Sequence, residues 1–211
     1  LRFYNNDDGE VPIFTFPDWE TLPYDKFSPH QDIVSERLTV LHQLPGLDRG
    51  ILIVPVSTLM HRLPPREFVQ SRTLVLDVGD TIEINSMRRR LEESGYRCVS
   101  QAMEHGEFAV RGSLLDLYPM GSRLPYRIEL FDDEVETIRT YDPETQRSID
   151  KVDRVRLLSA REFALDERGI RHFREAYRAT FEGDPKKSVV YRDISQGIAP
   201  PGIEYYLPLF F

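Results

Sequence analysis

The segment from Glu104 to Pro119 holds the residues best suited to chemistry, and that chemistry is recognition of a protein partner. Arg111 stands between Val110 and Gly112, where a purely structural strand needs only alternating apolar and polar residues. A guanidinium group makes several hydrogen bonds at once, so arginine is enriched at the centres of interfaces. Glycine lets the backbone bend or lets another chain come close. We expect a sheet edge that offers a cation and free main-chain groups.

Three more residues join this candidate contact set. Arg97 lies shortly before the segment and would extend its positive charge. Phe108 and Tyr118 would supply aromatic surface beside Arg111, although each is equally suited to a core. The predicted protein-binding residues are therefore Arg97, Phe108, Arg111, Gly112 and Tyr118.

Ordinary surface roles compete with these interpretations. Arg111 could simply pair with Glu107 or Glu129 on the strand surface, in an ion pair of the common, weak kind. The run from Arg88 to Arg90 could contact nucleic acid, but Glu92 and Glu93 follow it at once. That pattern favours a solvated helix face with pairs three or four residues apart.

The sequence shows no machinery for catalysis. A phosphate-binding Gly-x-x-x-x-Gly-Lys-Ser/Thr loop is absent, and no serine lies in a Gly-x-Ser-x-Gly turn. The five histidines have no metal-ligand spacing, and Cys98 has no second cysteine to pair with. We expect no catalytic residue, no metal and no cofactor in these residues.

Composition sets limits on the class of protein. With 211 residues, 40% hydrophobic and 29% charged, the chain is an ordinary globular one without an apolar run of the ~20 residues that a membrane span needs. One cysteine fits a reducing compartment, so we expect a cytoplasmic protein. A net charge of −8 disfavours strong duplex DNA binding, because that needs a positive surface. The polar start and the apolar end at Phe211 suggest a piece of a longer protein.

Three regions are expected to position the candidate residues. Residues 1–65 read as a partial α/β domain, with a strand over 11–16 and a helix capped by Ser28 and started by Pro29. The all-apolar run Ile51–Val54 predicts a strand buried on both faces of a parallel sheet. Pro64 and Pro65 mark the boundary to the second region.

Residues 66–160 read as an α+β domain in which one helix packs on a meandering antiparallel sheet. Met87 and Leu91 share a face of that helix, and Gly95 ends it. The expected strands cover 74–78, 107–111, 114–118, 126–131, 135–141 and 154–157. Residues 161–211 are expected to be helical, with a stripe of Ile170, Phe173 and Tyr177 and a second short helix near 190–195.

Several stretches, in order along the chain, resemble one family. They are Asp18–Asp25, Phe27–His30, Arg49–Val56, Met103–Glu107, Arg111–Gly112 with Leu114–Leu117, Glu129–Glu134 and Gly202–Tyr206. Together they resemble the N-terminal part of the bacterial transcription-repair coupling factors (Mfd), which is itself similar to the damage-recognition protein UvrB. The matches cover nearly the whole chain, and their order and spacing argue against chance.

The resemblance implies a fold and a role. Residues up to Pro65 would be part of a degenerate helicase-like domain, 66–160 the inserted domain shared with UvrB, and 161–211 a helical segment that returns to the UvrB-like domain. In the family the inserted domain docks UvrA, and the contact arginine maps to Arg111, with Arg97 as a weaker match. The full-length proteins are ATP-dependent DNA translocases whose partners include RNA polymerase and DNA. A masking partner within the full protein is also implied for this surface.

The chain departs from UvrB at two places. Lys26 leads straight to the helix near Ser28, where UvrB carries its aromatic hairpin, and Ala109 stands where UvrB has arginine. Two other functions stay open at this point. One is a part of an ATP-dependent DNA-processing enzyme that contributes to a nucleotide or DNA site, and the other is a purely structural scaffold.

Overall fold

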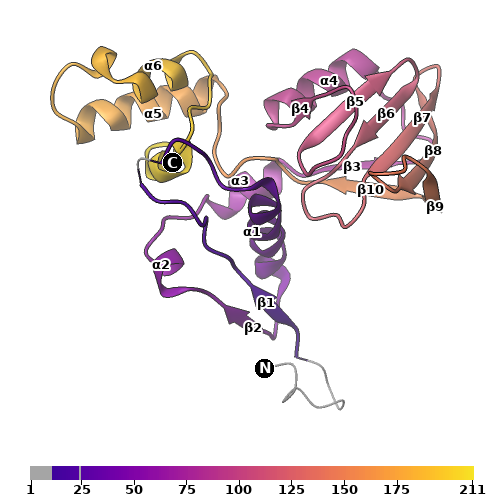
Figure 1. Ribbon diagram of the computed structural model, residues 1–211, viewed down its shortest axis with the longest axis horizontal. Coiled ribbons are helices and arrows are strands. Elements are labelled where there is room, and N and C mark those ends of the chain that lie inside the picture. Colours follow the sequence, from indigo (N-terminus) through magenta and orange to yellow (C-terminus); the bar gives the residue numbers. More distant parts are fainter. Residues whose placement is uncertain (1–10, 24) are drawn as a thin grey trace.

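The computed structural model describes residues 11–23 and 25–211. Helices and strands are mixed, and a six-stranded sheet lies beside smaller α/β and helical parts (Figure 1). This confirms the predicted fold class of α/β and α+β. The boundaries predicted near residues 65 and 160 stay predictions.

The first part of the chain forms a short parallel pair. Strand β1 (Ile13–Thr15) pairs in parallel with β2 (Ile51–Ile53), as expected. Helix α1 (Gln31–Gln43) and a 3-10 turn, Leu44–Gly46, connect them. The expected burial of β2 is wrong, because its three residues are 37–39% exposed. Within the described chain β1 is the only strand that pairs with β2, and in this two-stranded sheet β2 stays partly exposed instead of being buried on both faces.

Helix α1 begins two residues later than predicted. His30 is the N-cap, and its ring accepts a hydrogen bond from the Asp32 amide at 3.3 Å. Ser28 instead donates to Glu204 at 2.9 Å and accepts from the Gly202 amide at 3.2 Å. The Ser28 side chain, which the local pattern assigned to the helix cap, is therefore used in contacts with residues more than 170 positions away.

The six-stranded sheet follows the predicted meander. Its order is β4-β5-β6-β7-β8-β9, antiparallel from β5 onward, with β4 parallel to β5. The bounds are β4 Arg97–Cys98, β5 Glu107–Arg111, β6 Leu114–Leu117, β7 Tyr126–Phe131, β8 Glu134–Tyr141 and β9 Ser148–Val152. The pattern did not predict β4 or β9. The expected strands near residues 74 and 154 form a separate antiparallel pair, β3 (Leu74–Asp77) with β10 (Arg154–Leu157).

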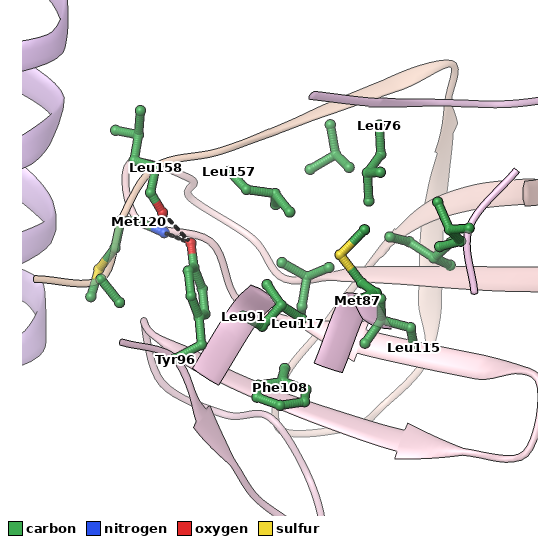
Figure 2. Close-up of a cluster of buried hydrophobic side chains, with 14 of the residues drawn as sticks. Leu76, Met87, Leu91, Tyr96, Phe108, Leu115, Leu117, Met120, Leu157 and Leu158 are labelled. Carbon is green, nitrogen blue, oxygen red and sulfur yellow. Dashed lines mark hydrogen bonds between the residues drawn. The ribbon is translucent and has the colours of Figure 1, made fainter. Parts of the chain in front are cut away.

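Helix α4 (Ile84–Glu93) covers one face of this sheet (Figure 1). Its buried Met87 and Leu91 lie in one cluster with Phe108 and Leu115 (Figure 2). Gly95 follows the helix with φ +95, which confirms the predicted C-terminal glycine. Beside it, the buried Tyr96 hydroxyl donates to the Leu158 carbonyl at 2.8 Å and accepts from the Met120 amide at 3.3 Å.

Helix α1 packs against the same cluster through Val34 and Leu38. Two short helices, α2 (Val56–Leu59) and α3 (Arg66–Ser71), lead from β2 to β3. The chain between β10 and the C-terminal helices passes back beside α1, where Glu162 forms a buried pair with Arg37.

The last part of the chain is helical, as predicted. It contains α5 (Glu167–Thr180), α6 (Val189–Ser195) and two 3-10 segments, Pro185–Lys187 and Ile203–Leu209. Phe173 is fully buried in a second cluster, which also takes Trp19 from the first part of the chain. The C-terminal residues therefore fold back onto the N-terminal part.

Candidate functional site

The face of the sheet opposite α4 carries the candidate site. Side chains alternate along a strand, so Phe108 and Val110 of β5 point toward α4 while Glu107, Ala109 and Arg111 share the other face. Arg111 ends β5, and its side chain is 49% exposed. Gly112 follows in the turn to β6 with φ +61 and open space around its Cα. Glycine is therefore favoured there, because it adopts a positive φ without steric cost.

Asp116 of β6 holds Arg111 in place. This carboxylate is fully buried, and it accepts hydrogen bonds from both Arg111 and Arg127. Arg127 binds it with two nitrogens, Nε to Oδ1 at 2.7 Å and Nη2 to Oδ2 at 2.9 Å. The alternative considered for Arg111, an ion pair with Glu107 or Glu129, does not form, because Arg111 pairs with Asp116 instead. A buried acid shared by two cations fixes both guanidinium groups against the sheet.

A second layer of contacts fixes Arg127. Its guanidinium lies 4.7 Å from the ring centre of Tyr141, within the range of a cation–π contact. The Tyr141 hydroxyl donates to the Ala102 carbonyl at 2.9 Å, and burial raises the pKa of this phenol. The hydrogen bond to Asp116 raises the pKa of Arg127, so the cation is strongly favoured. Asp116, Arg127 and Tyr141 together make a rigid support beneath Arg111.

Arg97, in β4, lies beside the other end of β5. It donates to Glu107 at 2.5 Å and stays 67% exposed. Burial raises the pKa of Glu107, but hydrogen bonds from the Met103 amide, from Arg97 and from the Glu104 amide outweigh it, so the pKa is lowered. Arg111 lies four positions after Glu107, which is roughly 13 Å along an extended strand. The two predicted arginines therefore mark the two ends of one strand.

The edge of β5 is partly open. Strand β4 pairs only with Glu107 and Phe108, and in the described chain no strand continues along Ala109 to Arg111 on that side. This agrees with the expected sheet edge near Arg111. Strand edges offer main-chain donors and acceptors to a partner.

Two predicted aromatic contacts do not join Arg111. Phe108 is 0% exposed in the core beneath α4, so it cannot touch a partner, and its place in the contact set is wrong. Tyr118 is half-buried, its ring lies tilted against that of His105 with the ring centres 4.3 Å apart, and its hydroxyl donates to the Arg123 carbonyl at 3.0 Å. It follows the end of β6 farthest from Arg111.

Sequence reasoning missed Asp116, Arg127 and Arg139. Arg139 lies directly opposite Arg127 on β8 and approaches Glu129 at 3.9 Å. The alternation of β6 and β7 contained the signal, because Asp116 and Arg127 occupy the polar positions between Leu115, Leu117, Tyr126 and Ile128. Which strands lie next to each other was the missing information.

Neither a metal site nor a membrane-spanning helix is found in the described part of the chain. Among residues 11–23 and 25–211, no three histidine, cysteine or acidic side chains are grouped as metal ligands would be. No helix in that same part of the chain has the length and apolar character to cross a membrane.

Comparison of the sequence with known proteins identifies its relatives. The family model described as the UvrB interaction domain matches residues 74–163, which include the sheet and α4. The chain is 50% identical over 199 residues to the transcription-repair-coupling factor of Escherichia coli (strain K12), which covers 94% of this chain and 17% of that protein. It is 51% identical over 202 residues to the factor of Haemophilus influenzae, covering 94% of this chain and 18% of that protein.

A more distant relative has the same description. The transcription-repair-coupling factor of Staphylococcus aureus (strain Mu50) is 33% identical over 195 residues, which covers 88% of this chain and 17% of that protein. The chain thus spans less than a fifth of the length of the relatives it matches. Residues 74–163 form a UvrB interaction domain, and the chain belongs to the transcription-repair-coupling factor family.

Proposed function

We propose that this chain is a protein-docking module of transcription-coupled DNA repair and that its UvrB interaction domain binds UvrA. The single observation that carries the proposal is Arg111, a half-exposed arginine at an open strand edge whose guanidinium a buried carboxylate holds in place. The matches to transcription-repair-coupling factors and to the UvrB interaction domain support the general role.

The geometry suits a charged protein partner. Arg111 bonds Asp116 through Nη2, and about half of its side chain remains open to solvent. A guanidinium that is already fixed loses less conformational freedom on binding than a mobile one. Arg127 and Arg139 lie in a row across the same face, with Arg127 15% exposed and paired with Asp116, and Arg139 34% exposed. We expect the partner to offer carboxylates to this row and main-chain groups to the edge of β5.

The proposal assigns no catalysis to these residues. ATP-driven movement along DNA and binding of RNA polymerase are proposed only for the longer proteins of the family. Gly112 contributes by making the turn that ends β5, and Arg97 forms a second, separate contact near Glu107. Phe108 contributes to the core instead.

Titration calorimetry of the chain against purified UvrA tests the proposal. Arg111→Glu should weaken binding by about 2 kcal/mol or more, roughly thirtyfold, as expected for a central interface arginine. Arg171→Glu is the matched control, because Arg171 is exposed on α5, away from the sheet. Equal affinity of the two variants for UvrA would move the contact elsewhere. Absence of binding by the folded chain would refute the docking role.

A further inference from the structure

A second cationic site lies at the other end of the sheet. A cavity of about 340 Å³ opens between α1, the loop after β6 and the strand β10. His42 of α1, Arg123 of the loop and Arg156 of β10 are among the residues that line it. We infer that this cavity binds a phosphate group.

The charge of the lining is the first argument. None of the described residues around this cavity is acidic, although the chain carries 35 acidic residues against 27 basic ones. Arg123 and Arg156 are both exposed, and neither forms an ion pair within the described chain. By contrast, the cavity of about 610 Å³ beside α4 is lined by four glutamates. Two cations without a nearby acid leave a positive charge that an anion would neutralise.

His42 is the second argument. Its Nε2 lies 3.5 Å from Nη1 of Arg156, which is always a donor. Burial and the charge of Arg156 both lower the pKa of this imidazole, so the ring is neutral near pH 7. With Nε2 as the acceptor, the proton resides on Nδ1. That atom is itself buried, so the imidazole contributes to the site by accepting from Arg156 and not by touching the ligand.

The cavity wall is already fixed without a ligand. The Gly121 amide donates to the Ser35 hydroxyl of α1 at 2.7 Å. Gly121 has φ +82, and a Cβ there would lie 2.7 Å from Oγ1 of Thr39, so the loop rests directly on the helix. Ser122 is tied down as well, since its carbonyl accepts from His105 at 2.7 Å. A pre-formed site needs little ordering when a ligand enters.

Phosphate matches these groups better than a carboxylate does. Its several oxygens can accept from two arginines at the same time, and arginine's planar fork fits phosphate well. The phosphate could belong to a free phosphate ester or to a DNA backbone. The site is separate from the docking surface, because Tyr126 in its lining pairs with Leu117, whereas Arg111 pairs with Leu114 at the other end of β6.

The test titrates the chain with inorganic phosphate and, separately, with a single-stranded oligonucleotide. Amide resonances of Gly121 and Ser122 are followed by NMR, so that binding elsewhere is not counted. The double variant Arg123→Gln/Arg156→Gln should weaken binding at least tenfold, and Arg171→Gln, an exposed arginine on α5, should leave it unchanged. The circular dichroism spectrum of each variant checks the fold.

The outcomes of the two titrations distinguish the two sources of the phosphate. Loss of inorganic phosphate binding in the double variant supports a site for free phosphate esters. Oligonucleotide binding that disappears in the double variant, without inorganic phosphate binding, supports contact with a nucleic-acid backbone. Absence of both interactions in the folded chain, or equal affinity in all three proteins, overturns the inference.

Discussion

At the scale of single residues, Asp116 determines how the candidate docking surface is built. A buried carboxylate is costly unless cations and hydrogen bonds compensate for its lost hydration. Here Arg127 supplies two hydrogen bonds and Arg111 a third. The orientation of Arg111 is thus a consequence of a charge buried one strand away. Surface arginines without such a support would be free to change rotamer.

Asp116→Asn should therefore destabilise the chain by roughly 1.5–3 kcal/mol, the typical contribution of hydrogen bonds to charged groups. The amide keeps the size of the side chain but removes its charge and one acceptor. Urea denaturation measures the change, with Asp133→Asn in the exposed β7–β8 turn as the control. A loss no larger than in the control would show that Asp116 does not hold the two arginines.

Glu204 makes stability depend on pH. Burial raises the pKa of this carboxyl above its ordinary value of 4.5, and the charge of Glu162 adds to the shift. The unfolded chain ionises first as pH rises, so stability falls between pH 4.5 and the raised pKa of the folded state. Glu204→Gln cannot ionise, and it keeps an acceptor for the Ser28 hydroxyl.

The variant should gain stability relative to the unmodified chain as pH rises through that window. Melting temperatures at about pH 4 and about pH 7 measure the difference. Glu136→Gln on the exposed side of β8 is the control and should show no such trend. A constant difference between Glu204→Gln and the unmodified chain at both pH values would contradict the assignment.

At the scale of elements, the periodicity of apolar residues predicted the helices and strands that are determined by their own local sequence. The alternation of apolar and polar residues predicted the bounds of β5 to β8 to within a residue or two. The apolar stripe of Met87 and Leu91, followed by Gly95, predicted α4. Strand β4 has two residues and exists only through its pairing with Glu107 and Phe108, so no periodicity could reveal it. The Ser28 cap and the burial of Ile51–Ile53 were wrong for the related reason that distant chain segments decide them.

For the candidate site too, some features were predictable from the local sequence and others were not. The exposure of Arg111 at a strand edge was predictable, because a charged residue at the end of an alternating strand belongs on its polar face. Its partner was not, since Asp116 reaches it only through the pairing of β5 with β6. The error at Phe108 was avoidable, because a residue three positions before Arg111 must point to the opposite face.

Two glycines allow a matched test of how α1 is attached to the sheet. Gly121 and Gly112 both have positive φ, but only Gly121 faces a neighbour, since a Cβ added there would stand 2.7 Å from Oγ1 of Thr39. Gly112→Ala should cost about 1 kcal/mol for backbone strain alone. Gly121→Ala should cost clearly more, because the loop must also move away from α1. Equal losses in urea denaturation would mean that the loop adjusts freely.

At the scale of the whole molecule, α1 connects the two hydrophobic clusters. Its Val34 and Leu38 lie in the cluster beneath the sheet, while Arg37 on the next face lies 4.8 Å from the Trp19 ring of the second cluster. The Arg37 guanidinium is fully buried and donates to Glu162 at 2.5 and 3.1 Å and to the Pro17 carbonyl at 2.8 Å. One ion pair thus ties together the first part of the chain, α1 and the segment that leaves β10.

Arg37→Leu should destabilise the whole chain by about 3–5 kcal/mol, because Glu162 would be left as a buried charge without a partner. The double variant Arg37→Leu/Glu162→Leu should recover part of that loss, since no charge then remains buried. Trp19 is the sole tryptophan and is 2% exposed, so its fluorescence reports the second cluster, while circular dichroism reports the sheet as well. If α1 couples the clusters, both signals shift together in thermal unfolding of the single variant. If only the fluorescence transition shifts, the second cluster unfolds independently of the sheet and α4, and α1 does not couple them.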